Sequence, residues 1–594
     1  MAFRTVAIRL SSSFLGFAVA GVLAAGVATR PAQAATTTYN FSNSNYSGGA
    51  INPGDTVLLN DGALFTGNVT DNGTLQFNFS AGQVLNVSST ISGTGTLALT
   101  NSGTLNLSGT TVANATIVLD MATSVSAGLL QIRSGIGSLR IGSSGTGTLN
   151  VTGGSVTGLE GFLGYNAGSI GLAGVSSGTW ATTTNLTVGR SGTGMLDVSG
   201  GRVTSNFANI GGQSGGFGTV TVSSGTLSMS SFLNLGRSGT GRLEVTGGLL
   251  TNFSGTIGLA AGGLGTATVS DGTWYNGGDL VVGASGTGKL TMTGGLVTVG
   301  GILSKGSAGT INLNSGGTLQ IGAGSTGGVL NLDSLVNNGT LIFNRSDAST
   351  YSGDLSGSGA VAKQGAGQLT LAGANSYSSL TTISAGTVAL SGAGSIGTGG
   401  LNLGTTGSPG VFDLLGLTAS SYSLPSSAAL AGVGTIAGNG KSLAVLGSLA
   451  PGNSAGTITV GTGLSLDLSN SGTSLFEITS PAFTAGTFDL VSGDGSVVFG
   501  GILNLAFSGG TYADGTDVLQ IFATTGGRSG NFSAVNATGL AAGQSATFNA
   551  ATGTISVVPE PSTYVIAGLS SVGLAGMMRW RKRRAAKSGT GATC

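Results

Sequence analysis

The chain has 594 residues, of which 114 are Gly and only 7% are charged, and it contains no His and a single Cys. So much Gly opposes long helices, while a hydrophobic content of 40% excludes a disordered linker. Only 8 Pro and no Gly-X-Y period exclude collagen, and the absence of His removes Ser-His-Asp catalysis and His metal sites. The composition therefore predicts an all-β chain with many Gly-marked turns.

The first 34 residues have the pattern of an export leader. An Arg-containing start precedes an apolar stretch over residues 10–27, and Ala-Gln-Ala ends the segment at position 34. This order of a charged start, an apolar core and a small-residue cleavage site is typical of a signal peptide. We therefore predict a signal peptide over 1–34 with cleavage-site residues Ala32 and Ala34, and export of the remaining chain.

Short apolar runs separated by Gly fill the next 300 residues. Residues 35–143 repeat motifs such as Gly-Thr-Leu-Gln-Phe, and within 144–336 the segment at 144–154 recurs three times at a spacing of 47 residues. Weaker copies halve that spacing to 23 or 24 residues, and each of these units holds about three apolar runs. Such a unit cannot bury its apolar side until neighbours stack on it. The pattern predicts the coils of a parallel β-helix, or solenoid, over both segments.

Two sets of positions in the 47-residue repeat differ in variability. Leu is constant at one position and the residue before it varies, which predicts that Leu faces inward and the variable residue faces outward. A third position holds Trp or Leu, and here filling of the core or a corner is favoured over a strip of aromatic rings that would stack on sugars. The inward position holds Leu149, Leu196, Leu243 and Leu290. The variable position holds Thr148, Met195, Arg242 and Lys289. The Trp/Leu position holds Trp180, Leu227 and Trp274.

The segment 337–457 has a different repeat. Asn-Gly-Thr-Leu-Ile-Phe at 338–343, Gly-Ala-Gly-Gln-Leu-Thr-Leu at 365–371 and Ala-Gly-Thr-Val-Ala-Leu at 385–390 follow one another closely. This succession resembles the autotransporter-associated β-strand repeat, although Ser-Ser-Leu replaces the usual Gly-Gly before Thr381. Ala-Pro-Gly-Asn-Ser-Ala-Gly-Thr, which ends at residue 457, resembles the module that follows such helices. The resemblance implies a β-helical passenger.

Residues 458–557 carry longer apolar runs and most of the remaining aromatic residues. We expect this segment to form a β-rich cap or small sandwich, because an open helix end is an exposed sheet edge that something must cover. The aromatic residues that suggest the cap are Phe476, Phe483, Phe488, Phe499, Phe507, Tyr512, Phe522, Phe532 and Phe548.

A short apolar helix and a basic cluster end the chain. We expect a single transmembrane helix over about residues 563–580, near the short limit for spanning a bilayer. The basic stop at 579–584 is retained on the cytoplasmic side, so 585–594 forms a cytoplasmic tail and all upstream residues lie across the membrane. The basic residues of the stop are Arg579, Arg581, Lys582, Arg583 and Arg584.

The tripeptide Pro559-Glu560-Pro561 directly precedes this helix. The tripeptide, the helix and the basic end, together residues 558–584, closely resemble the PEP-CTERM protein-sorting signal. The resemblance implies a Gram-negative bacterium that makes exopolysaccharide, and an exosortase that cuts near the tripeptide. The alternative is an ordinary single-pass anchor, in which Pro only marks the start of the helix.

The near-zero net charge of the whole chain hides an acidic body. Between the leader and the tail, 12 basic residues stand against 19 acidic ones, a formal charge of −7. Nucleic-acid binding needs a basic surface and is disfavoured. The only Cys, Cys594, follows the basic stop, so the exported body has no thiolate ligand for zinc, haem or an iron–sulfur cluster. We expect no metal and no other cofactor.

Carboxylates are the only serious catalytic candidates. Asp197 and Glu244 occupy one repeat position and would lie two coils apart, roughly 10 Å at about 4.8 Å per coil. A glycosidase pair needs a shared cleft, and a solvated repeat face is the favoured interpretation. Asp514-Gly-Thr-Asp517 could hold calcium, but a β-turn is favoured because further oxygen ligands at calcium-loop spacing are missing.

These features predict an exported, non-enzymatic structural or adhesive protein of the cell surface or extracellular matrix. It would be anchored transiently in the inner membrane, sorted by an exosortase and associated with exopolysaccharide or biofilm. Two alternatives stay open. The first is a polysaccharide-active enzyme on a β-helix, and the second is a passenger-like adhesin for a protein partner.

Overall fold

The computed structural model describes residues 37–560, apart from positions 43, 81–82, 88, 102–103, 115, 120–121, 133–137, 453–454, 483, 485 and 516–517. The predicted leader with Ala32 and Ala34, Pro561, the transmembrane helix and the basic stop therefore lie outside the described residues. Every named element within them is a β-strand. Over the same residues, no helix has the length and apolar character needed to cross a membrane.

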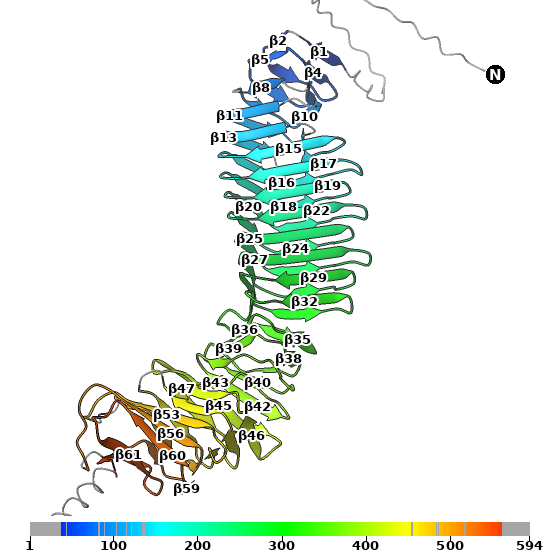
Figure 1. Cartoon of the computed structure of the whole chain (residues 1–594). Helices are drawn as coiled ribbons and strands as arrows, with labels where there is room; N and C mark the ends of the chain where they lie inside the picture. The colour runs from blue at the N-terminus through cyan, green and yellow to red at the C-terminus, as the bar shows by residue number, and fades with distance from the viewer. Residues whose placement is uncertain are drawn as a thin grey trace, which may run out of the picture.

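One ladder of parallel strands runs from near the start of the described chain to near its end (Figure 1). Each strand in this ladder pairs in parallel with the next, at intervals of one coil. The predicted all-β parallel solenoid is confirmed. The ladder consists of β3 (Gly49–Ile51), β6 (Val69–Asp71), β9 (Ile91–Ser92), β11 (Thr104–Asn114), β13 (Ala122–Ile132), β16 (Ser155–Leu163), β18 (Thr179–Val188), β20 (Arg202–Ser205), β23 (Thr226–Met229), β25 (Thr240–Asn252), β27 (Leu264–Asn276), β30 (Leu296–Val299), β33 (Thr318–Ile321), β36 (Thr340–Asn344), β39 (Ala360–Gln364), β41 (Thr381–Ile383), β43 (Leu401–Asn402), β47 (Ala429–Gly432), β50 (Ser448–Pro451), β53 (Thr473–Ile478), β56 (Ile502–Phe507) and β60 (Ala534–Thr538).

Two further ladders complete each coil in the 47-residue repeat region. The front face contains the first parts of β25 and β27 together with β15 (Thr146–Val151), β17 (Ile170–Val175), β19 (Thr193–Val198), β22 (Phe217–Val222), β29 (Thr287–Met292) and β32 (Gly309–Leu313). The second face contains the last parts of β16 and β18 together with β14 (Ser138–Ile141), β21 (Phe207–Ile210), β24 (Phe232–Leu235), β26 (Ser254–Ile257), β28 (Leu280–Val282) and β31 (Ile302–Lys305).

A column of glycines turns the chain from the second face to the front face, and we call it the glycine corner. Gly189 has φ 71°, and a Cβ there would lie 2.2 Å from the carbonyl oxygen of Phe217 on the next coil. Only Gly fits such a left-handed, closely approached position. The corner comprises Gly142, Gly164, Gly189, Gly211, Gly236, Gly258 and Gly283, all with positive φ.

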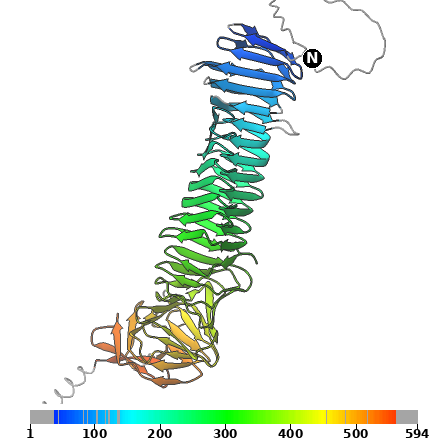
Figure 2. The same ribbon diagram turned by 90° about the vertical axis from the view of Figure 1, so that its right-hand side faces the viewer.

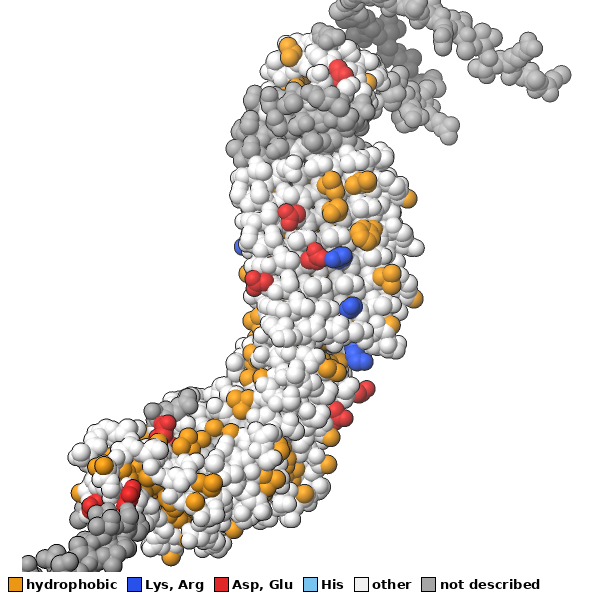
Figure 3. Space-filling model, viewed as in Figure 1, with side chains coloured by type: hydrophobic (Ala, Val, Ile, Leu, Met, Phe, Trp, Pro, Cys, Tyr) orange, Lys and Arg blue, Asp and Glu red, His pale blue; other side chains and the backbone are white. Residues whose placement is uncertain are grey.

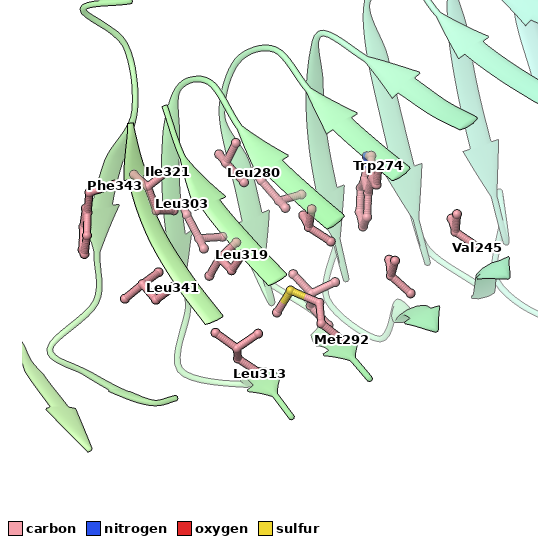
Figure 4. Close-up of a cluster of buried hydrophobic side chains, with 14 of the residues drawn as sticks. Val245, Trp274, Leu280, Met292, Leu303, Leu313, Leu319, Ile321, Leu341 and Phe343 are labelled. Carbon is pink, nitrogen blue, oxygen red and sulfur yellow. The ribbon is translucent and has the colours of Figure 1, made fainter. Parts of the chain in front are cut away.

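The constant repeat positions line the core. Leu149, Leu243 and Leu290 are 0% exposed, whereas Met195 at a variable position is 47% exposed. This confirms the predicted inward and outward positions. The Trp/Leu position is also in the core, because Trp180, Leu227 and Trp274 are all buried. Figure 4 shows how side chains from successive strands, such as Trp274, Leu303 and Phe343, point into the space inside the coils.

The solenoid has two arms that meet at a bend. Its first arm runs straight from β1 (Thr38–Phe41) to β32, and its axis changes direction before β36 (Figures 1 and 2). Near the bend, the guanidinium of Arg345 forms an ion pair with Asp347 at 2.8 Å. The second arm holds the segment that resembles the autotransporter-associated repeat.

The parallel coils continue through much of the segment expected to form a separate cap. Parallel pairing extends to β60, and the antiparallel part is a sheet of β57 (Val518–Gln520), β61 (Gln544–Asn549) and β62 (Thr554–Pro559). Phe548 from β61 packs against Phe499 and Phe532 of the last coils, with ring centroids 5.0 Å away in each case. The aromatic residues indicate burial here, but their pattern does not distinguish parallel from antiparallel strands, so the predicted cap is correct only for its final sheet.

Candidate functional surface

The carboxylates of the front face do not converge. In the strand register, Asp197 pairs with Thr221, which pairs with Glu244, so the two acids lie two coils apart as predicted. Nε of Arg242 donates a hydrogen bond to Glu244 at 2.9 Å. Asp197 is exposed and lies on the other side of Thr221. The front face therefore presents Asp197 as an exposed acid and Glu244 as part of an ion pair, and most of its visible surface carries no charge (Figure 3).

A shallow hollow of about 320 Å³ indents the front face beside Asp197. Gly174 forms part of its floor because this residue lies between Asn150 and Asp197 in the strand register and has no side chain to fill the gap. Leu172 and Met195 form its apolar side. The sequence repeat alone did not predict this hollow, since Gly174 belongs to a weaker copy. A Gly at a position otherwise held by Asn, Asp, Thr or Glu is nevertheless a usable signal.

No metal-binding cluster is found among the described residues, in which no three Asp, Glu, His or Cys side chains gather. Asp514 lies in a turn, and its carboxylate accepts a hydrogen bond from the Gln544 side chain at 2.7 Å. Asp517, the other acid of the candidate calcium motif, lies outside the described residues.

A lysine lies inside the second arm, where the coil of β39 and β40 (Gln368–Leu371) stacks on the coil of β41 and β42 (Thr387–Gly392). Lys363 is 1% exposed and donates hydrogen bonds from Nζ to the carbonyl oxygens of Gln364 at 2.6 Å and Gly365 at 2.7 Å. Burial lowers the pKa of Lys363 to about 8. The ammonium group therefore satisfies backbone carbonyls at a corner and has a structural role.

Tyr377 closes the same region of the core. Its hydroxyl lies 2.7 Å from Oγ1 of Thr381, and burial raises the pKa of Tyr377 to about 12. Its ring fits directly against Gly397, where a Cβ would lie 2.3 Å from the ring atom Cδ2. Tyr377 thereby fixes the distance between two stacked coils.

The loop after β50 combines backbone strain with a buried acid. Ala455 has φ 60°, and no other non-Gly residue in the described chain has positive φ. The next residue, Gly456, donates its N–H to Asp489 Oδ1 at 2.7 Å, and the Glu477 N–H donates to Asp489 Oδ2 at 2.9 Å. Burial outweighs these hydrogen bonds and raises the pKa of Asp489 to about 6. Asp489 thus holds the strained loop against the adjacent strand.

The structure places two residues of the predicted sorting motif. Pro559 is the last residue of β62 and pairs with Gln544 of β61. The Glu560 N–H donates a hydrogen bond to the carbonyl oxygen of Gly543 at 2.8 Å. The start of the motif is therefore part of the antiparallel sheet, whereas Pro561 lies outside the described residues.

Comparison with known families gives one match. Residues 361–390 match the passenger-associated transport repeat, and this stretch contains Lys363 and Tyr377. The search of curated proteins gives no match. A transport-associated repeat on a β-helix points to an exported surface protein. The match agrees with the predicted autotransporter-associated repeat for these 30 residues, while the PEP-CTERM signal stays a prediction.

Proposed function

We propose that this chain is a non-enzymatic structural or adhesive protein of the cell surface or extracellular matrix, associated with extracellular polysaccharide. The observation that carries the proposal is the passenger-associated transport repeat at 361–390 within a parallel solenoid. A rod of stacked coils displays a long, extended surface. Outward Thr, Ser and Asn side chains offer weak hydrogen bonds that add up along a polymer.

Sorting by an exosortase is the second part of the proposal. Its basis is the order of Pro559-Glu560-Pro561, an apolar segment and a basic end. Deletion of residues 559–584 should leave the protein in the periplasm or medium instead of on the surface, as measured by fractionation and immunoblotting. Deletion of 585–594, which lie beyond the basic stop, is the matched control and should not change the distribution. Unchanged sorting after the first deletion would refute this part.

The proposal includes no enzymatic turnover. Asp197 is the acid beside the front hollow, while Glu244 is already paired with Arg242. Purified protein should release no reducing ends from acidic or neutral polysaccharides. Reducing-end release that disappears in Asp197→Asn but persists in the control Asp271→Asn would instead establish a polysaccharide-active enzyme.

A further inference from the structure

Two arginines share one tyrosine ring in the middle of the first arm. The guanidinium carbon of Arg140 lies 4.1 Å from the ring centroid of Tyr165, and that of Arg190 lies 4.3 Å from the same centroid. The two cations are therefore separated by no more than the sum of these distances. Phe162 supports the ring edge-on at a centroid distance of 5.2 Å. Stacking on an aromatic ring holds both guanidinium groups in place before any ligand arrives.

Most hydrogen-bond donors of these arginines are unused by the described protein. A guanidinium group has five N–H donors. Arg140 donates from Nε to Ser138 Oγ at 3.2 Å, and Arg190 donates from Nη1 to the carbonyl oxygen of Tyr165 at 3.5 Å. The ion pairs found among the described residues involve neither arginine. Two like charges are thus held close together with donors available for an anion.

The arginines begin a basic edge along the glycine corner. Arg190 directly follows Gly189, and Arg237 follows Gly236 at the equivalent position two coils further, roughly 10 Å away at about 4.8 Å per coil. The turns of this corner, such as 164–169, 189–192 and 236–239, contain no Asp or Glu, and Glu160 lies on the strand beside Arg140, opposite Ser138. The edge is therefore locally basic on a body whose formal charge is −7. We define the basic edge as Arg140, Tyr165, Arg190, Gln213 and Arg237.

The spacing of the charges indicates the kind of anion. Between Arg190 and Arg237 lies the exposed Gln213, whose Oε1 accepts a hydrogen bond from Ser191 Oγ at 2.8 Å and whose amide nitrogen is a donor. DNA presents about one charge per 1.7 Å and needs a dense array of cations. Sparse cations separated by polar side chains fit a polymer whose anionic groups are separated by uncharged, hydroxyl-bearing units.

We propose that the basic edge binds the carboxylate groups of an acidic polysaccharide. Arg140 and Arg190, on the two sides of the Tyr165 ring, each offer a guanidinium group to a carboxylate, since a guanidinium group matches carboxylate oxygens in a bidentate geometry. Arg237 binds the next carboxylate along the chain, and Gln213 donates to a hydroxyl between them. This inference rests on the proposed association with polysaccharide and names the class of polymer and the edge that binds it.

The test measures binding of the full chain to polygalacturonate, a carboxylated polysaccharide, and to dextran, a neutral one, by isothermal titration calorimetry. The edge variant is the double substitution Arg140→Gln and Arg190→Gln, and the matched control is Arg202→Gln with Lys289→Gln. Both variants lose two positive charges, and the control residues are exposed residues of other faces. All variants keep the same C-terminal cations, so differences between them report the body.

We expect the edge variant to bind polygalacturonate at least tenfold more weakly than the wild type, and the control variant to bind as the wild type does. Arg237→Gln, which changes an exposed side chain and leaves the aromatic cluster intact, should also weaken binding. Equal affinity of the wild type and the edge variant would overturn the inference, as would equal losses in the edge and control variants. Binding to dextran without binding to polygalacturonate would refute carboxylate binding by the basic edge but keep the proposed association with polysaccharide. Binding to neither polymer would refute both.

Discussion

Replacing Asp489 by Asn should remove a pH-dependent part of the stability of the second arm. Asp489 is 3% exposed, and its carboxylate accepts hydrogen bonds from the N–H groups of Gly456 and Glu477. Because burial raises its pKa to about 6 in the folded chain, while the ordinary value is 3.8, the folded state binds a proton that the unfolded state releases between these two values.

The sign and size of the effect follow from this difference. The stabilising contribution of the protonated Asp489 is fully present below pH 3.8 and is lost as the pH rises through 6. A shift of about 2 units corresponds to about 3 kcal/mol in the free energy of unfolding. Relative to Asp489→Asn, the wild type should therefore gain up to about 3 kcal/mol between pH 7 and pH 4.

The assay is denaturant unfolding of both proteins, followed by circular dichroism at several pH values. The difference in free energy of unfolding between the two proteins isolates this group, because all other acids are common to both. Asp494→Asn is a suitable control, since Asp494 lies nearby on the surface and accepts a hydrogen bond from the Thr525 hydroxyl. A difference that stays constant with pH, or that favours Asp489→Asn more strongly at pH 4, would refute the argument.

Three further predictions concern packing and backbone strain. Trp180→Ala should lower the free energy of unfolding by about 3–5 kcal/mol. Trp180→Leu should lower it by at least about 1 kcal/mol less than Trp180→Ala, because Leu227 fills the equivalent position. Equal losses for the two variants in denaturant melts would contradict this. Ala455→Gly should raise the stability by up to about 1 kcal/mol because Ala455 has φ 60°, and a lower unfolding midpoint would contradict the strain. Gly397→Ala should lower the free energy of unfolding by about 1–3 kcal/mol, because it forces a methyl group against Tyr377. Amide hydrogen exchange in residues 361–390 should become faster. Unchanged exchange would contradict the prediction.

The repeat region was predictable because its sequence is periodic in the same unit as its structure. A spacing of 23 or 24 residues with three apolar runs corresponds to one coil of three strands, and the constant Leu149 and Leu243 lie inside as expected. Trp180 was assigned to the core for a physical reason, since Leu substitutes there. The passenger-associated repeat was predicted from its closely spaced Gly-Gln-Leu and Gly-Thr-Val motifs.

The features that were missed depend on contacts between coils. Arg140 precedes the glycine corner on one coil, whereas Tyr165 and Arg190 follow it at equivalent positions on the next two coils, so no single repeat copy contains the cluster. Gly174 produces a hollow only because its neighbours on the adjacent coils carry side chains. Strand direction after residue 458 depends on which strands pair, and apolar alternation is the same in parallel and antiparallel strands.

The most direct test of an exported surface protein is the accessibility of the first arm in intact cells of the native host. The chain has one Cys, so Cys594→Ser combined with Met195→Cys places a single thiol on the exposed front face. A membrane-impermeant maleimide should label this thiol in intact cells to the same extent as after lysis. Labelling that occurs only after lysis would contradict surface display.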